Sequence, residues 1–109
     1  MEIGIDIEEI DRIQKAHKKW GERFLERVYT KKEVEYCFIK QNPYPSLCGR
    51  FCAKEAVIKA TSGSLSFKEI EIINDKKGKP VVFINGKKSD IKISLSHSKK
   101  YAAAVAVAQ

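Results

Sequence analysis

Four ionisable side chains occur within residues 49–60, a segment that otherwise has the composition of a buried helix. On a helix, Arg50 and Lys54 share one narrow polar edge, and Glu55 and Lys59 share the other. Two explanations are open. Glu55 and Lys59 form a solvated ion pair worth about 0.2–0.5 kcal/mol, or a carboxylate and three cations on a rigid helix line a site for a phosphate ester and its metal ion.

The same segment has apolar residues on two sides. At 100° per residue they form two stripes on roughly opposite sides of the helix. The larger stripe consists of Ala53, Ala56, Val57 and Ala60, and the smaller one of Phe51 and Ile58. We therefore expect the helix to be covered on two faces, which would make it a rigid mount for a site.

Asp6 is the second acid that could bind a metal. Isoleucines at 3, 5 and 7 alternate with residues 2, 4 and 6, which is the period of a half-buried strand with Asp6 facing away from the isoleucines. Mg²⁺ is usually held by one or two carboxylates, several waters and substrate phosphates. Asp6 and Glu55 are the two acids that we pair as ligands, although their separation in the sequence does not by itself bring them together.

His97 ends a predicted strand over residues 91–96, with the parity of its apolar side chains. A hydrogen-bonded core histidine is one reading. The serines and lysines at 96 and 98–100 favour another, an anion-binding rim. The next strand, residues 101–107, is followed by Ala108 and is built from small side chains, so another element can approach it closely.

The whole chain is short and basic. Its 109 residues fit one domain, residues 1–109, and 43% are hydrophobic, which favours a folded globule. The net charge of +7, with its excess concentrated in residues 12–32, implies a negatively charged partner: nucleic acid, an anionic membrane surface, a phosphorylated cofactor or an acidic protein. No segment has the roughly 20 apolar residues of a membrane span, and the N-terminus lacks a signal-peptide layout. We expect a cytosolic protein with three buried free thiols.

After the first strand, the sequence pattern predicts helices and then further strands. A helix is predicted from about Glu8 to Lys19. Basic residues recur on one face of this region, which is either a solvated surface or a docking surface; they are Arg12, Lys15, Lys19 and Arg23. A capping box at Thr30 and Glu33 begins a helix through about Lys40, residues 41–45 break it, and the segment with four charges lies in a helix over residues 46–61. Strands follow at 70–73, 81–84, 91–96 and 101–107. The fold class is α+β, a helical N-terminal half packed on a mostly antiparallel sheet.

Three separated motifs together resemble one family. Residues 3–13, 49–60 and 93–97 followed by Tyr101 and Ala102 resemble the opening strand and helix, the Lys-Glu-Ala helix and the closing Ser-x-Ser-His strand of the 4′-phosphopantetheinyl transferases. The likeness is to the short, holo-acyl-carrier-protein synthase type, and it spans nearly the full chain in order. Residues 23–33 and the turn at 78–80 are similar as well.

The resemblance implies an activity and a set of roles. Such enzymes transfer 4′-phosphopantetheine from coenzyme A to a serine of acyl carrier protein in fatty acid biosynthesis, use Mg²⁺, and are typically trimers with coenzyme A between subunits. The roles implied here are Mg²⁺ ligands for Asp6 and Glu55, coenzyme A phosphate contacts for Lys59 and Arg50, a position near the nucleotide for Lys54, closure of the coenzyme A pocket for His97, and carrier-protein docking for Arg12, Lys15, Lys19 and Arg23.

Two departures and two alternatives stand beside this resemblance. Cys52 replaces a common alanine, and the connection over residues 61–64 is shorter than the family's glycine-rich loop, which leaves the adenine-side contacts open. A small basic nucleic-acid-binding module is the alternative that the net charge supports. A carrier-protein binder without catalysis is the other.

Overall fold

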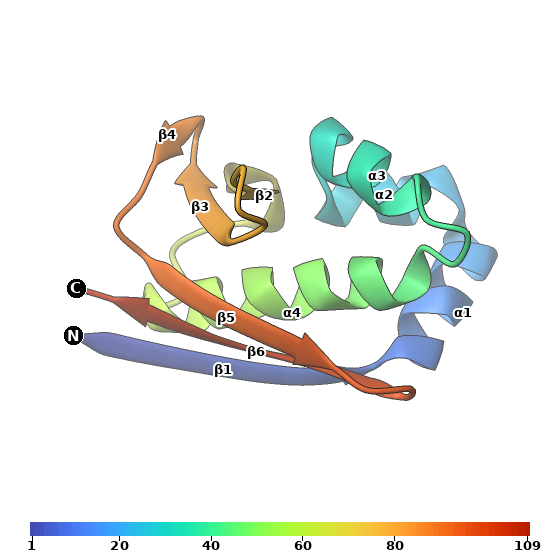
Figure 1. Cartoon of the computed structure of the whole chain (residues 1–109), viewed down its shortest axis with the longest axis horizontal. Helices are drawn as coiled ribbons and strands as arrows, with labels where there is room; N and C mark the ends of the chain where they lie inside the picture. Colours follow the sequence, from blue (N-terminus) through green and yellow to red (C-terminus); the bar gives the residue numbers. More distant parts are fainter.

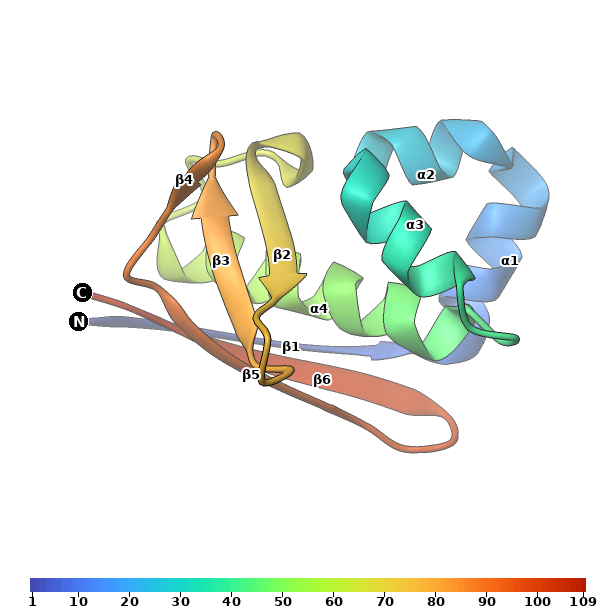
Figure 2. The ribbon, with the colours of Figure 1, turned by 45° about the horizontal axis from the view of Figure 1, so that its top comes forward.

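Helix α4 (Tyr44–Ala60) runs through the middle of the molecule and separates its two halves. The structure is a computed structural model that describes all residues, 1–109. On one side of α4 lies a three-stranded sheet, and on the other lie a second small sheet and a group of three helices (Figures 1 and 2). The predicted α+β class is confirmed, but the strands form two sheets where one was expected.

The first sheet has the order β1-β6-β5 and is antiparallel throughout. Its strands are β1 (Glu2–Glu9), β5 (Lys92–His97) and β6 (Tyr101–Ala108). Four alanines of β6, at 102, 104, 106 and 108, are buried on the side of α4. Gly4 of β1 comes so close to the helix that a Cβ there would collide with the backbone of Ala56 and Ala60. The predicted close approach along the small-residue strand is confirmed.

The orientation of β1 differs from the simplest interpretation of its alternation. Ile3, Ile5 and Ile7 are 66%, 66% and 63% exposed, whereas Gly4 and Asp6 lie on the side covered by α4. A helix can approach a sheet closely only over small side chains, and the glycine and the alanines supply them. Alternation therefore identified the two faces of the strand correctly but did not say which face this chain would bury.

The second sheet has the order β2-β3-β4, also antiparallel. It consists of β2 (Ile70–Asn74), β3 (Pro80–Ile84) and the short, unpredicted β4 (Lys87–Lys88), and it follows a 3₁₀ turn, η1 (Phe67–Glu69). The four strands predicted after the helices agree with the structure to within one residue at each end: 70–73, 81–84, 91–96 and 101–107.

The helices lie near their predicted positions, but their ends and their number differ from the prediction. Strand β1 continues to Glu9, so α1 (Ile10–Trp20) begins two residues later than predicted. Gly21, with φ of 62°, separates α1 from α2 (Glu22–Val28), which the sequence pattern did not reveal. Helix α3 (Lys31–Phe38) has the predicted capping box, with 3.3 Å from the Glu33 nitrogen to Thr30 Oγ1 and 2.8 Å from the Thr30 nitrogen to Glu33 Oε1.

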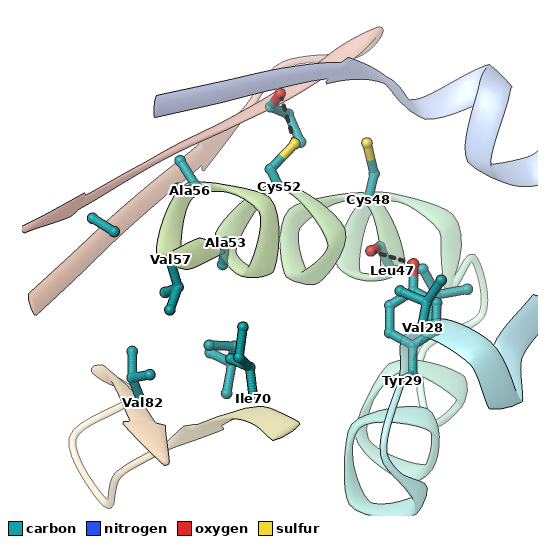
Figure 3. Close-up of a cluster of buried hydrophobic side chains, with 14 of the residues drawn as sticks. Val28, Tyr29, Leu47, Cys48, Cys52, Ala53, Ala56, Val57, Ile70 and Val82 are labelled. Atoms are coloured by element: carbon teal, nitrogen blue, oxygen red, sulfur yellow. Dashed lines mark hydrogen bonds between the residues drawn. The ribbon is translucent and has the colours of Figure 1, made fainter. Parts of the chain in front are cut away.

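The hydrophobic core surrounds α4 on both sides, as Figure 3 shows. Cys48, Cys52 and Ala56 lie toward the first sheet, and Val57 lies toward Ile70 and Val82 of the second sheet. Tyr29 is buried in the helical half and donates its hydroxyl to the Leu47 carbonyl at 2.7 Å. The prediction of three free, buried cysteines is confirmed. No helix is long and apolar enough to cross a membrane.

Candidate active site

Asp6 and Lys59 meet where β1 crosses α4. Lys59 Nζ lies 3.4 Å from Asp6 Oδ1 and donates to the Ile5 carbonyl at 2.9 Å, so the lysine spans from the helix to the strand. The Asp6 side chain is only 9% exposed, and its second oxygen, Oδ2, is buried with no hydrogen-bond partner. A buried carboxylate oxygen without a donor is costly, so this oxygen is suited to contact a cation or a hydrogen-bond donor.

Glu55 belongs to the same cluster. Burial, and after it the Asp6 carboxylate, raises the pKa of Glu55 above its ordinary value, while Lys59 opposes the shift. The pKa of Glu8 is also raised, by burial and then by Asp6. We call Asp6, Glu8, Glu55 and Lys59 the carboxylate cluster. Glu8 was not among the predicted site residues, although its strand parity with Asp6 could have identified it.

The carboxylate cluster fits a magnesium ion but not a full protein cage. No group of three or more His, Cys, Asp or Glu side chains is arranged to hold a metal. Asp6 and Glu55, with the unpartnered Asp6 Oδ2, provide the one or two carboxylates that Mg²⁺ uses when waters and substrate phosphates complete its coordination. The donor set therefore fits a magnesium ion that is bound together with a phosphate.

A second candidate region is a pocket of about 360 Å³ between α3, α4, the β2–β3 turn and β5. It is lined by side chains that carry or can carry positive charge and by no acid: Lys40, Arg50, Lys79 and His97. We call it the cationic pocket. His97 is exposed at its rim, with Nδ1 3.4 Å from the Ser98 carbonyl, so the alternative of a core histidine is wrong. Lys40 and Lys79 were missed, because nothing in their local sequence marks them as neighbours of Arg50.

Arg50 forms the inner wall of the cationic pocket. Its side chain is buried at 4% exposure, it donates to Asn74 Oδ1 at 3.1 Å, and its Cζ lies 4.4 Å from the centre of the Tyr36 ring. Its Nε is buried without an acceptor. A guanidinium held in this way suits a planar, multi-point contact with phosphate oxygens.

The two regions are separated by α4. Arg50 and Lys59 are nine residues apart, which places them about 180° apart around a helix. The structure thus brings Asp6, Glu55 and Lys59 together, and Arg50 and His97 together. It does not bring these two groups together within one chain.

Lys54 does not lie at either region. Its side chain is 0% exposed, and its ammonium contacts Glu33 Oε1 at 2.6 Å, the Val28 carbonyl at 2.7 Å and the Phe67 carbonyl at 3.2 Å. Burial lowers its pKa, and Glu33 opposes that shift. All three ammonium donors are used inside the protein, so the predicted position near a nucleotide is wrong, and Lys54 joins helices α2, α3 and α4.

The predicted docking residues lie on the surface of α1 and α2. Arg12, Lys15, Lys19 and Arg23 are all exposed. Arg12 lies 3.9 Å from Glu8, and Lys15 lies 2.9 Å from Asp11. Arg23 also lines a cavity of about 440 Å³ whose walls are mostly apolar, together with Arg27, which was not predicted. The apolar walls are Ala16, Trp20, Phe24, Val28, Phe51 and Phe67.

The amino-acid sequence matches one known protein family along almost its whole length. The family model for the 4′-phosphopantetheinyl transferase superfamily matches residues 2–106. The chain belongs to this superfamily. The resemblance found in the three motifs is therefore confirmed over almost the whole sequence.

Relatives within the superfamily match from end to end. The chain is 47% identical to a holo-[acyl-carrier-protein] synthase of Chloroherpeton thalassium, over 98% of this chain and 96% of the relative, and 45% identical to one of Chlamydia trachomatis, over 98% of each. Among solved structures, the synthase of Helicobacter pylori in complex with coenzyme A has a TM-score of 0.86 and 34% identity, covering 96% of this chain and 97% of the other. The Neisseria meningitidis synthase has a TM-score of 0.87 and 31% identity, covering 99% and 97%.

Proposed function

We propose that this chain is a cytoplasmic holo-acyl-carrier-protein synthase of fatty acid biosynthesis. It transfers 4′-phosphopantetheine from coenzyme A to a serine of apo-acyl carrier protein and releases adenosine 3′,5′-bisphosphate. The observation that carries the proposal is the full-length similarity to holo-[acyl-carrier-protein] synthases, one of them solved with coenzyme A. The carboxylate cluster and the cationic pocket supply the two kinds of phosphate site that such a substrate requires.

The reaction is a displacement at phosphorus. The serine hydroxyl oxygen forms a bond to the phosphorus that carries pantetheine, the bond from that phosphorus to the bridging oxygen breaks, and the bridging oxygen leaves with the bisphosphate. Lys59 stabilises negative charge on the phosphate oxygens. Glu55 accepts the serine proton through a water. Asp6 and Glu55 would hold Mg²⁺, which would supply neutralisation of negative charge on phosphate oxygens.

The assembly that we propose is a homotrimer with coenzyme A bound between neighbouring copies. The carboxylate cluster and Arg50 lie on opposite edges of α4, so a site shared by two copies brings a cluster from one chain to a pocket of the next. The open face of the first sheet provides an apolar surface for that contact, because three isoleucines of β1 are exposed there.

The proposed partner surface is the basic face of α1 and α2. Arg12, Lys15, Lys19 and Arg23 would meet acidic side chains of the carrier protein, since charge complementarity speeds encounter. The apolar cavity beside Arg23 would accept an apolar side chain from the same partner.

Intact-mass measurement of an acyl carrier protein tests the proposal. The purified chain is incubated with Mg²⁺, coenzyme A and apo-carrier protein, and we expect the carrier to gain one phosphopantetheine. A carrier whose acceptor serine is replaced by alanine is the control and should not change. An unmodified apo-carrier, in a reaction where an authentic synthase modifies it, would refute the proposal.

A further inference from the structure

Tyr36 of α3 contacts two of the cations that line the pocket, Arg50 and Lys40. Arg50 Cζ lies 4.4 Å from the centre of its ring, and Lys40 Nζ lies 4.6 Å from the same centre. Both are within the roughly 6 Å at which a cation is attracted to an aromatic face. Lys40 is further fixed by Ser46, whose Oγ is 2.9 Å from Nζ. One half-buried ring thus holds two cations that line the pocket.

The hydroxyl of Tyr36 has two hydrogen bonds, and it is the acceptor in both. Lys40 Nζ is 3.3 Å away and can only donate. Asn74 Nδ2 is 3.1 Å away. The orientation of that amide is set by Arg50, which has only donors and so must contact Asn74 Oδ1. The hydroxyl proton of Tyr36 is therefore left without an acceptor in the protein.

Arg50 leaves a second donor unused in the same network. Its Nε is buried without a hydrogen-bond partner. The guanidinium is instead positioned by the ring of Tyr36 and the side-chain amide of Asn74. The residues that line the pocket include no Asp or Glu. A network with unused hydrogen-bond donors, several positive charges and no acid is suited to bind an anion.

We propose that Tyr36 is both a ligand-binding and a positioning residue of the cationic pocket. Its O–H donates to a phosphate oxygen of the ligand, and its ring holds Arg50 and Lys40 against the same group. The inference rests on the proposed function for the identity of the ligand, which is the phosphate-bearing nucleotide end of coenzyme A. Nothing in the sequence motifs distinguishes Tyr36, because its partners come from α4, β2 and the segment after α3.

Two substitutions separate the two roles. Tyr36→Phe keeps the ring and removes the donor, whereas Tyr36→Leu removes both. Calorimetric titration with adenosine 3′,5′-bisphosphate should show about tenfold weaker binding for Tyr36→Phe, the effect of one hydrogen bond to a charged group, and a further loss of several-fold for Tyr36→Leu. Tyr44→Phe is the matched control, because that hydroxyl bonds to His17 and Tyr44 does not line the pocket; it should bind as the unaltered chain does.

A third variant tests positioning against simple packing. In an Arg50→Ala background, the additional loss between Tyr36→Phe and Tyr36→Leu should shrink, because one of the cations that the ring holds is gone. In turnover, Tyr36→Phe should raise KM for coenzyme A about tenfold with kcat retained, and circular dichroism should show the same fold. An unchanged bisphosphate affinity for Tyr36→Phe would overturn the binding role, and an undiminished extra loss in the Arg50→Ala background would overturn the positioning role.

The outcome is distinguishable from failure of the proposed function. If the unaltered chain modifies the carrier protein but Tyr36→Phe binds the bisphosphate normally, only the inference about Tyr36 fails. If the chain does not modify the carrier while Tyr36→Phe still weakens bisphosphate binding, the function fails and the anion site stands. If the unaltered chain does not bind the bisphosphate, the inference is overturned.

Discussion

The carboxylate cluster and the cationic pocket are built in different ways around the same helix. The cluster is formed by two regular elements in direct contact, and Gly4 lets β1 lie against α4 so closely that Asp6 is almost buried. The pocket is formed by side chains from α3, α4, the β2–β3 turn and the end of β5, and Tyr36 contacts three of its lining residues, Lys40, Arg50 and Asn74. The first arrangement depends on backbone packing, and the second depends on contacts between side chains.

This difference predicts how each region responds to substitution. A change at the cluster removes a group that the reaction needs while the backbone contact persists. A change at the pocket alters the placement of several cations at once and should appear mainly in binding. Four predictions test this distinction.

Glu55→Gln should have the largest effect. Loss of the charge removes a proposed metal ligand and proton acceptor, so we expect kcat to fall on the order of 10³-fold. Stability should change little, because the substitution also removes a carboxylate that Asp6 disfavours. Carrier modification followed by mass spectrometry gives the rate, with the exposed Glu35→Gln as a matched control. Retention of more than a tenth of the activity would contradict the role.

Lys54→Met should be the most destabilising change on α4. It leaves the buried carboxylate of Glu33 without its 2.6 Å partner, and breaking a buried pair in this way costs about 3–5 kcal/mol. Urea unfolding followed by circular dichroism measures the loss. Lys59→Met is the paired comparison: Lys59 is half exposed, so it should lose activity with a much smaller change in the free energy of unfolding. Equal destabilisation by both would remove the distinction.

Arg50→Ala tests the pocket directly. The loss of a guanidinium that contacts phosphate should raise KM for coenzyme A roughly 10- to 100-fold, from the energy of hydrogen bonds to charged groups, while kcat changes less. Initial rates at varied coenzyme A concentration provide the measurement. A fall in kcat as large as that of Glu55→Gln would mean that the two regions are not functionally separate.

Arg12→Glu should have the smallest effect, because Arg12 is exposed and touches the carboxylate cluster only through its 3.9 Å contact with Glu8. Charge reversal on the exposed face of α1 should raise the apparent KM for the carrier protein several-fold, more at low salt than at high salt, and leave KM for coenzyme A unchanged. Lys88→Glu, on the exposed β4, is the control of equal charge. An equal response of both variants would argue for a general effect of net charge.

The extent of prediction from the sequence follows the same division. Asp6, Glu55 and Lys59 could be chosen as candidates from the sequence because each lies in a motif whose local periodicity survives in the structure, which places them near one another. Tyr36, Lys40 and Asn74 were not, because their relation to Arg50 exists only after four elements have packed. Lys54 was misassigned for a similar reason: helical spacing predicted its edge, but its buried partner Glu33 lies in another helix. Local patterns also left open which face of β1 is buried.

The pairing of the first strand with the last has a consequence for synthesis. Glu2 pairs with Ala108 and Glu9 with Tyr101, so β1 finds its neighbour only when β6 is available. Contacts of such large sequence separation form late and slowly. During translation the helical half and the second sheet can form first, whereas the strand that carries Asp6 gains its neighbour only after β6 has been synthesised. Removal of the last eight residues, Ala102 to Gln109, would therefore leave α4 in place but without a fixed partner for its Glu55 edge.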